Sequence, residues 1–136
     1  MPQPVLPSLC PCGSGEPYTS CCEPLHRGRV TGLTTAPTAE RLMRSRFSAF
    51  AVGDAAYLLL SWHPSTRPAT LDLDPRLEWT KLDILATTAG QEHDAEGTVD
   101  FVAHFRDTTT RRPGSQHELS AFRREAGQWF YVAAVR

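Results

Sequence analysis

The stretch that decides the fold is GTVDFVAHFR, residues 97–106, in which apolar and polar residues alternate. Val99, Phe101, Ala103 and Phe105 occupy every second position of it. Successive side chains of a strand point to opposite faces of its sheet, so this period of two predicts a strand with one apolar and one polar face. Sheets built from such strands are typically antiparallel and pack their apolar face on a core.

The strand pattern continues on both sides of this stretch. Further strands are predicted over residues 77–85, 117–124 and 128–135. Ala126 and Gly127 separate the last two and predict a tight hairpin between them. Consecutive strands joined by turns of this kind indicate an antiparallel meander.

Two helices are predicted before the strands. Thr38 can cap the first, whose apolar residues recur at helical spacing up to Gly53, a residue suited to a helix end. Asp54 can cap the second, which runs to Trp62 and is stopped by Pro64. Because this second segment is apolar nearly all round, we expect it to be buried on more than one side.

Helices followed by antiparallel strands predict an α+β domain with its helices on one face of a curved sheet. The composition changes near residue 36, before which lie all four cysteines and several prolines and glycines. We therefore expect a small loop-rich module with its linker over residues 1–36, and a conventional α+β domain over residues 37–136.

The composition also excludes several classes of function. The 136 residues carry 14 Lys and Arg against 15 Asp and Glu, a formal net charge of −1. A mainly electrostatic grip on nucleic acid is therefore not expected, nor is direct sequence-specific DNA binding. The longest apolar run, residues 55–60, is much shorter than the roughly 18 to 20 residues that span a bilayer, so no membrane insertion is expected. Residues 1–10 lack the basic start and apolar stretch of a signal peptide, which predicts a cytoplasmic protein.

The strongest chemical signal is CPCGSGEPYTSCC, residues 10–22, which contains Cys10, Cys12, Cys21 and Cys22. Structural zinc takes four thiolate or imidazole ligands in a tetrahedron, and two close pairs of cysteines supply a complete set. Thiols stay reduced in the cytoplasm, which favours metal binding over disulfides. A segment this short has no core of its own, so a structural Zn²⁺ would supply its folding energy.

Three alternatives remain open for these cysteines. They could form disulfides, or one of them could be a nucleophile with His26 as its base. His26 could also replace Cys22 as the fourth zinc ligand. Zinc bound by four cysteines is the prediction that we carry forward.

The cysteine stretch resembles the SEC-C motif, a small zinc-binding module named after the C-terminus of the SecA translocation ATPase. The stretches that follow resemble, in order, the YchJ family of small bacterial proteins; they are LMRSRFSAF (42–50), GDAAYLLLSW (53–62), TRP (66–68), GTVDFVAHF (97–105) and residues 118–131. The resemblance implies a SEC-C module followed by a nuclear transport factor 2-like domain, a cone of curved antiparallel sheet closed by helices. It also implies that the four cysteines bind zinc, and it brings no assigned reaction.

Cone-shaped domains of this kind often hold a cavity between sheet and helix, and polar or aromatic side chains inside it are candidates for ligand binding or proton transfer. The candidates here are Arg46, Tyr57, Trp62, His63, Trp79, Asp100 and His104. Asp100 and His104 share one face of a strand and could meet in a cavity, although that face is usually solvated. The tryptophans could instead pack in the core, and His63 could cap helix carbonyls.

Arg46 lies on or beside the apolar stripe of the first predicted helix, so we expect it to be partly buried. Pairing with a carboxylate such as Asp54 or Glu78 is the structural interpretation, because buried charges are paired. A bound anion is the functional interpretation.

Two hypotheses of function follow. The first is a non-enzymatic, zinc-stabilised binding protein whose SEC-C module contacts a protein or ribonucleoprotein partner, by analogy with SecA and with no catalytic residue. The alternative is a small-molecule binding protein or enzyme that uses a pocket in the cone-shaped domain.

Overall fold

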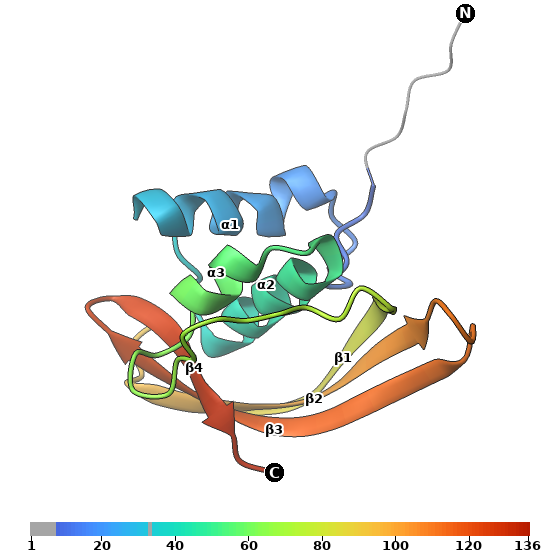
Figure 1. The fold of residues 1–136 in the computed structure, drawn as a ribbon. Helices are drawn as coiled ribbons and strands as arrows, with labels where there is room; N and C mark the ends of the chain where they lie inside the picture. The colour runs from blue at the N-terminus through green and yellow to red at the C-terminus, as the bar shows by residue number, and fades with distance from the viewer. Residues whose placement is uncertain (1–7, 33) are drawn as a thin grey trace, which may run out of the picture.

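In the computed structural model, which describes residues 8–32 and 34–136, three α-helices lie on one face of a four-stranded antiparallel sheet (Figure 1). The sheet runs in the order β1-β2-β3-β4, so each strand pairs with its neighbours in sequence. The predicted α+β class and antiparallel meander are confirmed. The stretch on which a signal peptide was excluded falls largely in residues 1–7, outside the described residues.

The first three strands are longer than predicted, and the last ends one residue earlier. They are β1 (Leu77–Ala89), β2 (Glu96–Asp107), β3 (Pro113–Glu125) and β4 (Gln128–Ala134). Residues 86–89 continue β1 although they lack apolar alternation, because they pair along β2, with Thr87 opposite Val99. Two register shifts in β1 mark bulges, which bend a strand and so help to curve the sheet.

The predicted hairpin between β3 and β4 is confirmed. Ala126 and Gly127 have φ of 51° and 76°, and Glu125 pairs with Gln128 across them. Both central residues are therefore left-handed, as the two-residue turn that matches strand twist requires. Only the glycine adopts this conformation without strain.

The two predicted helices are present as α2 (Ala39–Val52) and α3 (Ala55–Leu60). The Thr38 hydroxyl accepts a hydrogen bond from the Arg41 N–H at 3.1 Å, and the Asp54 carboxylate accepts one from the Tyr57 N–H at 3.0 Å. Both predicted N-caps are therefore formed. At the other end of α2, Gly53 has a φ of 79°, as a left-handed helix end requires.

The predicted end of α3 was wrong. The helix ends at Leu60 rather than Trp62, because the chain there joins the edge of β4: Tyr131 N donates to Ser61 O at 2.8 Å, and His63 N donates to Tyr131 O at 2.7 Å. The helix packs on both α1 and α2, as expected of a segment buried on more than one side, although Leu60 is 40% exposed.

A further helix, α1 (Cys22–Thr31), occupies a segment that the sequence indicated to be loop-rich. It lies on the far side of α2 and α3 from the sheet (Figure 1). Its buried side consists of Leu25 together with the polar residues His26 and Arg29 and with Gly28, which approaches Thr34 closely. A helix that buries mainly polar groups gives no apolar periodicity to detect.

The main core lies between α2 and the concave face of the sheet. Phe47 of α2 meets Val99 and Phe101 of β2 there, with Phe122 of β3 and Trp129 of β4. None of the described helices is long and apolar enough to cross a membrane.

Candidate metal centre and cavity

The side chains of Cys10, Cys12, Cys21 and Cys22 meet in one cluster, called the cysteine cluster below. Their four Sγ atoms all lie within 4.8 Å of one another, and those of Cys12 and Cys21 are 3.7 Å apart. A tetrahedron with Zn–S bonds of about 2.3 Å has S–S edges of about 3.8 Å. The cluster therefore has dimensions that four thiolates around one metal ion require. Three of the cysteines are buried and Cys21 is partly exposed.

Local turns bring these cysteines together. Cys10 N donates to Glu16 O at 2.8 Å, and Gly13 N donates to Cys10 O at 3.2 Å, so the chain folds back on itself. Gly13 has a φ of 84°, which a residue with a side chain rarely adopts. The short 3₁₀-helix η1 (Tyr18–Ser20) then leads directly to Cys21 and to α1.

His26 does not belong to the cysteine cluster. Its Nε2 donates to the Ser45 carbonyl at 2.8 Å, which leaves Nδ1 to accept from the Tyr18 hydroxyl at 2.7 Å. Burial lowers the pKa of His26, so the ring is a neutral core group. The alternatives in which His26 replaces Cys22 as ligand or activates a cysteine are therefore not supported. All four cysteines are free thiols here, without a disulfide.

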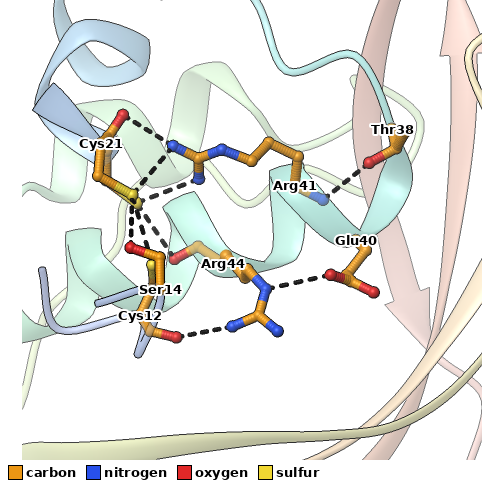
Figure 2. A network of polar contacts seen from close by, with 8 residues as sticks. Cys12, Ser14, Cys21, Thr38, Glu40, Arg41 and Arg44 are labelled. Atoms are coloured by element: carbon orange, nitrogen blue, oxygen red, sulfur yellow. Dashed lines mark hydrogen bonds and ion pairs between the residues drawn. The ribbon is translucent and has the colours of Figure 1, made fainter. Parts of the chain in front are cut away.

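Two arginines of α2 hold the cysteine cluster against the sheet domain, as Figure 2 shows. Arg41 donates to the sulfurs of Cys22 and Cys21 at 3.3 and 3.4 Å, and to the Cys21 carbonyl at 2.7 Å. Arg44 donates to the Cys12 carbonyl at 2.8 Å and pairs with Glu40. A guanidinium on the sulfurs compensates negative charge, as four thiolates around a divalent cation require.

The thiols of the cysteine cluster are themselves perturbed. The pKa of Cys12 is lowered to about 4, chiefly because the side chain of Cys22 hydrogen-bonds to its sulfur. The pKa of Cys22 is raised by that same hydrogen bond and by burial. At neutral pH the cluster therefore contains at least one thiolate, the form that binds metals.

A second candidate site is a cavity of about 180 Å³ between α2 and the sheet, called the Arg46 cavity below. Of the predicted candidates, Arg46, Trp62 and Trp79 line it. Tyr57 does not line it, and its hydroxyl lies 2.7 Å from Ser45 Oγ instead. His63 lies at the edge of β4, between Ser65 and Glu125, with its Nε2 2.9 Å from the Glu125 carboxylate.

The expectation that Asp100 and His104 meet in a cavity was wrong. Both point away from the core, on the outer face of β2, and each pairs with a neighbouring strand. Asp100 lies 2.6 Å from His117, and His104 lies 2.8 Å from Asp83. The hydrogen bond from His104 lowers the pKa of Asp83. These pairs therefore stabilise the solvated face, as the structural interpretation of the pattern predicted.

Comparisons with known proteins agree with this architecture. The family model described as "YchJ, middle NTF2-like domain" matches residues 38–134. The chain belongs to the YchJ family. A UPF0225 protein of Streptomyces coelicolor is 51% identical over 123 residues, which cover 90% of this chain and 91% of that protein. One from Chromobacterium violaceum is 47% identical and covers 94% of this chain and 93% of its own length.

Two solved structures are similar to this YchJ family member over most of its length. A SEC-C motif containing protein of Rhodopseudomonas palustris has a TM-score of 0.76 and 32% identity, covering 92% of this chain and 95% of that one. A second, from Psychrobacter arcticus, has a TM-score of 0.75 and 27% identity, covering 91% and 80%. The predicted resemblance to the YchJ family and its SEC-C motif is confirmed.

Several residues at the two candidate sites of this YchJ family member were not among those predicted from the sequence. Arg41, Arg44 and Ser48 contact the cysteine cluster and lie at positions i, i+3 and i+7 of α2, so a polar stripe at helical spacing could have identified them. Gln116 and Glu118 line the Arg46 cavity. Counting back in steps of two from an inward-facing aromatic residue of β3 reaches both.

Proposed function

We propose that Cys10, Cys12, Cys21 and Cys22 bind one structural Zn²⁺, and that the module so stabilised contacts a protein or ribonucleoprotein partner. The observation that carries the metal is the approach of four sulfurs to within 4.8 Å of one another. Thiolate donors favour zinc over the harder cations magnesium and calcium.

A zinc ion at this centre would have a structural role. Four cysteine ligands fill a tetrahedral zinc and leave no position for water or substrate, whereas catalytic zinc keeps one position open. The ion would supply the folding energy that a segment with only cysteines in its local core lacks. A non-enzymatic function is therefore the one we favour.

The surface for a partner would be the loop beside the buried sulfurs. Residues 13–16 are exposed, while Cys12 on one side of them is buried. A metal would fix the shape of this loop, since the cysteines at both ends of it share the same site. A small rigid loop lowers the entropy lost on binding, which favours a contact role.

Metal analysis of the purified protein tests the first part. About one zinc per chain is expected, and Cys12→Ser should lose it, because the remaining three thiolates bind far more weakly. Ser20→Ala, an exposed substitution between the two cysteine pairs, should keep the metal. A metal-free protein with four titratable thiols would contradict the assignment.

Affinity capture from bacterial lysate tests the second part. Partners of the module should be lost with chelator and with Glu16→Lys on the exposed loop, yet be retained by Glu92→Lys in the exposed turn between β1 and β2. Identical partner sets in all four samples would count against a contact function of the module.

A further inference from the structure

Arg46 is a buried cation without a carboxylate partner. It is 3% exposed, and the ion pairs found among residues 8–32 and 34–136 do not include it. The expected pairing with Asp54 or Glu78 is wrong, because Asp54 caps α3 and Glu78 is exposed on β1. Burial lowers the pKa of Arg46 to about 10, which is still well above neutral, so the side chain remains charged.

Only one nitrogen of the Arg46 guanidinium donates hydrogen bonds within the part of the chain that the structure describes. Its Nη1 donates to Leu58 O at 2.8 Å and to Ser61 Oγ at 2.7 Å. Its Nε and Nη2 donate to no residue that the structure describes. The free edge of a guanidinium has the geometry that a carboxylate accepts in a two-pronged pair.

The other buried arginine shows what a purely structural role looks like. Arg29 uses both terminal nitrogens, donating to Trp129 O at 2.9 Å and to Leu60 O at 3.4 Å, and stacks on Phe130. Arg46 likewise lies over aromatic rings, 4.4 Å from the centroid of Tyr131 and 5.3 Å from that of Trp62. Within the described part of the chain, Arg29 leaves only its Nε without an acceptor, whereas Arg46 leaves both Nε and Nη2 without one at the wall of a cavity.

The size and lining of the Arg46 cavity limit what could occupy it. Its volume of about 180 Å³ is slightly larger than the roughly 150 Å³ cavity that accommodates benzene in an engineered lysozyme. Phe50, Trp79 and Phe101 give it flat apolar walls, and the exposed Gln116 marks its opening to solvent. An occupant would therefore combine a compact, flat apolar body with one polar group.

From these features we infer that the Arg46 cavity binds a small organic monocarboxylate with a flat apolar body, its carboxylate paired with Arg46 and its body held between the aromatic walls. This function goes beyond the metal centre and does not depend on it, since no cysteine lines the cavity. The proposed role of the cavity is reversible binding of this ligand, and no covalent bond is made or broken.

Glu118 is the one acidic residue that lines the same cavity. It forms no ion pair with Arg46 in the described part of the chain, and it accepts a hydrogen bond from Gln116 instead. Its charge opposes an anion, so a second negative group on the ligand would be disfavoured. Neutralising Glu118 should accordingly tighten the binding of a monocarboxylate.

Titration of the full-length protein with three probes of one shape tests the inference. Benzoate carries the negative charge, benzamide is its neutral counterpart and benzylamine carries a positive charge. Binding is followed by tryptophan fluorescence and by the indole NMR signals of Trp62 and Trp79. We expect benzoate to bind at least about tenfold more tightly than benzamide, as a charge-assisted pair provides. Benzamide or benzylamine binding as tightly as benzoate, or no saturable change with benzoate, would overturn it.

Variants show whether benzoate occupies this cavity. Ala103→Leu should abolish binding by filling it, and Glu118→Gln should tighten binding several-fold without altering the core. Glu78→Gln, an exposed change on β1, is the control and should have no effect. Should Ala103→Leu fail to fold, Glu118→Gln still decides, because unchanged or weaker affinity in that variant contradicts the proposed site.

Discussion

Residues 8–21 and the four-stranded sheet are stabilised in opposite ways. The sheet and α2 share a core in which many apolar side chains, such as Phe47, Val99 and Trp129, each contribute a part. The N-terminal segment packs a separate small group that consists of Cys10, Cys12 and Cys22 with Tyr18 at its side. A distributed core loses stability in increments, whereas a segment organised around one centre keeps or loses its structure as a whole.

The two regions meet along α1 and α2. Cys22 begins α1 and belongs to the cysteine cluster, while Leu25, one turn later, belongs to the main core. Arg41 and Arg44 reach from α2 to the cysteines. The contrast between the regions can therefore be tested by changes made on each side of this contact.

Removal of the proposed zinc ion is expected to have the largest effect. Structural zinc contributes on the order of 10 kcal/mol to the folding of small zinc modules. Chelation should make residues 8–21 lose their ordered structure, while the sheet stays folded and α1 stays anchored through Leu25 and Arg29. Amide NMR spectra recorded before and after chelation would show this as loss of dispersion confined to the N-terminal signals. Collapse of the sheet signals as well would show that the regions do not fold independently.

Truncation in the sheet core should give the opposite pattern. Phe122 of β3 is 2% exposed, and Phe122→Ala should lower the free energy of unfolding by about 3 to 5 kcal/mol through lost burial and a cavity. Denaturant unfolding measures the loss, and metal content of the folded fraction should not change. Val135→Ala, at a side chain 58% exposed, is the control and should alter stability by less than about 0.5 kcal/mol.

The contact between the regions predicts an intermediate effect. Arg41→Gln removes the guanidinium that donates to two of the sulfurs, so metal affinity should fall about 10- to 100-fold, as outer-shell changes typically do. Competition with a chromophoric chelator measures it. Arg27→Gln, on the exposed side of α1, should leave affinity unchanged. Equal affinities for the Arg41 variant and wild type would mean that this arginine only packs against the cluster.

The same contrast explains what could be predicted from the sequence. The alternation in β2 and the caps Thr38 and Asp54 are local signals, and each produced the predicted element. The four cysteines were recognisable because small structural zinc modules commonly take their ligands from two closely spaced pairs, a pattern that the sequence shows directly. α1 gave no such signal, because its buried side mixes the polar residues His26 and Arg29 with Leu25.

The errors in the cavity have a different cause. Which face of β2 is solvated follows from the alternation, so the outward direction of Asp100 and His104 was predictable. The contacts of Arg46 were not predictable from the sequence. They depend on how the chain after α3 meets β4, which places the guanidinium over the rings of Tyr131 and Trp62. Long-range contacts of this kind carry no periodicity in sequence.

The buried side chain of His26 should make the stability of the protein depend on pH. Burial lowers the pKa of His26, so the unfolded chain takes up a proton at a higher pH than the folded protein does. The stability that neutral His26 provides is thus present above its ordinary pKa of about 6.5 and is lost as the pH falls below it. We expect the urea concentration at the unfolding midpoint to fall as the pH is lowered, and to fall less steeply for His26→Gln than for wild type. His93→Gln, at an exposed histidine, should follow the wild-type curve.

The smallest expected effect is a gain in stability from a substitution in the turn between β3 and β4. Ala126 has a φ of 51°, which disfavours alanine, whereas asparagine tolerates the left-handed region and is preferred at this position of the turn. Ala126→Asn should therefore raise the free energy of unfolding by about 0.5 to 1 kcal/mol. Gly127→Ala, at a φ of 76°, should lower it instead. Both substitutions lie in the sheet region, so the thermal unfolding midpoint should rise for the first and fall for the second while the metal content stays constant. A change in metal content would contradict the separation of the two regions.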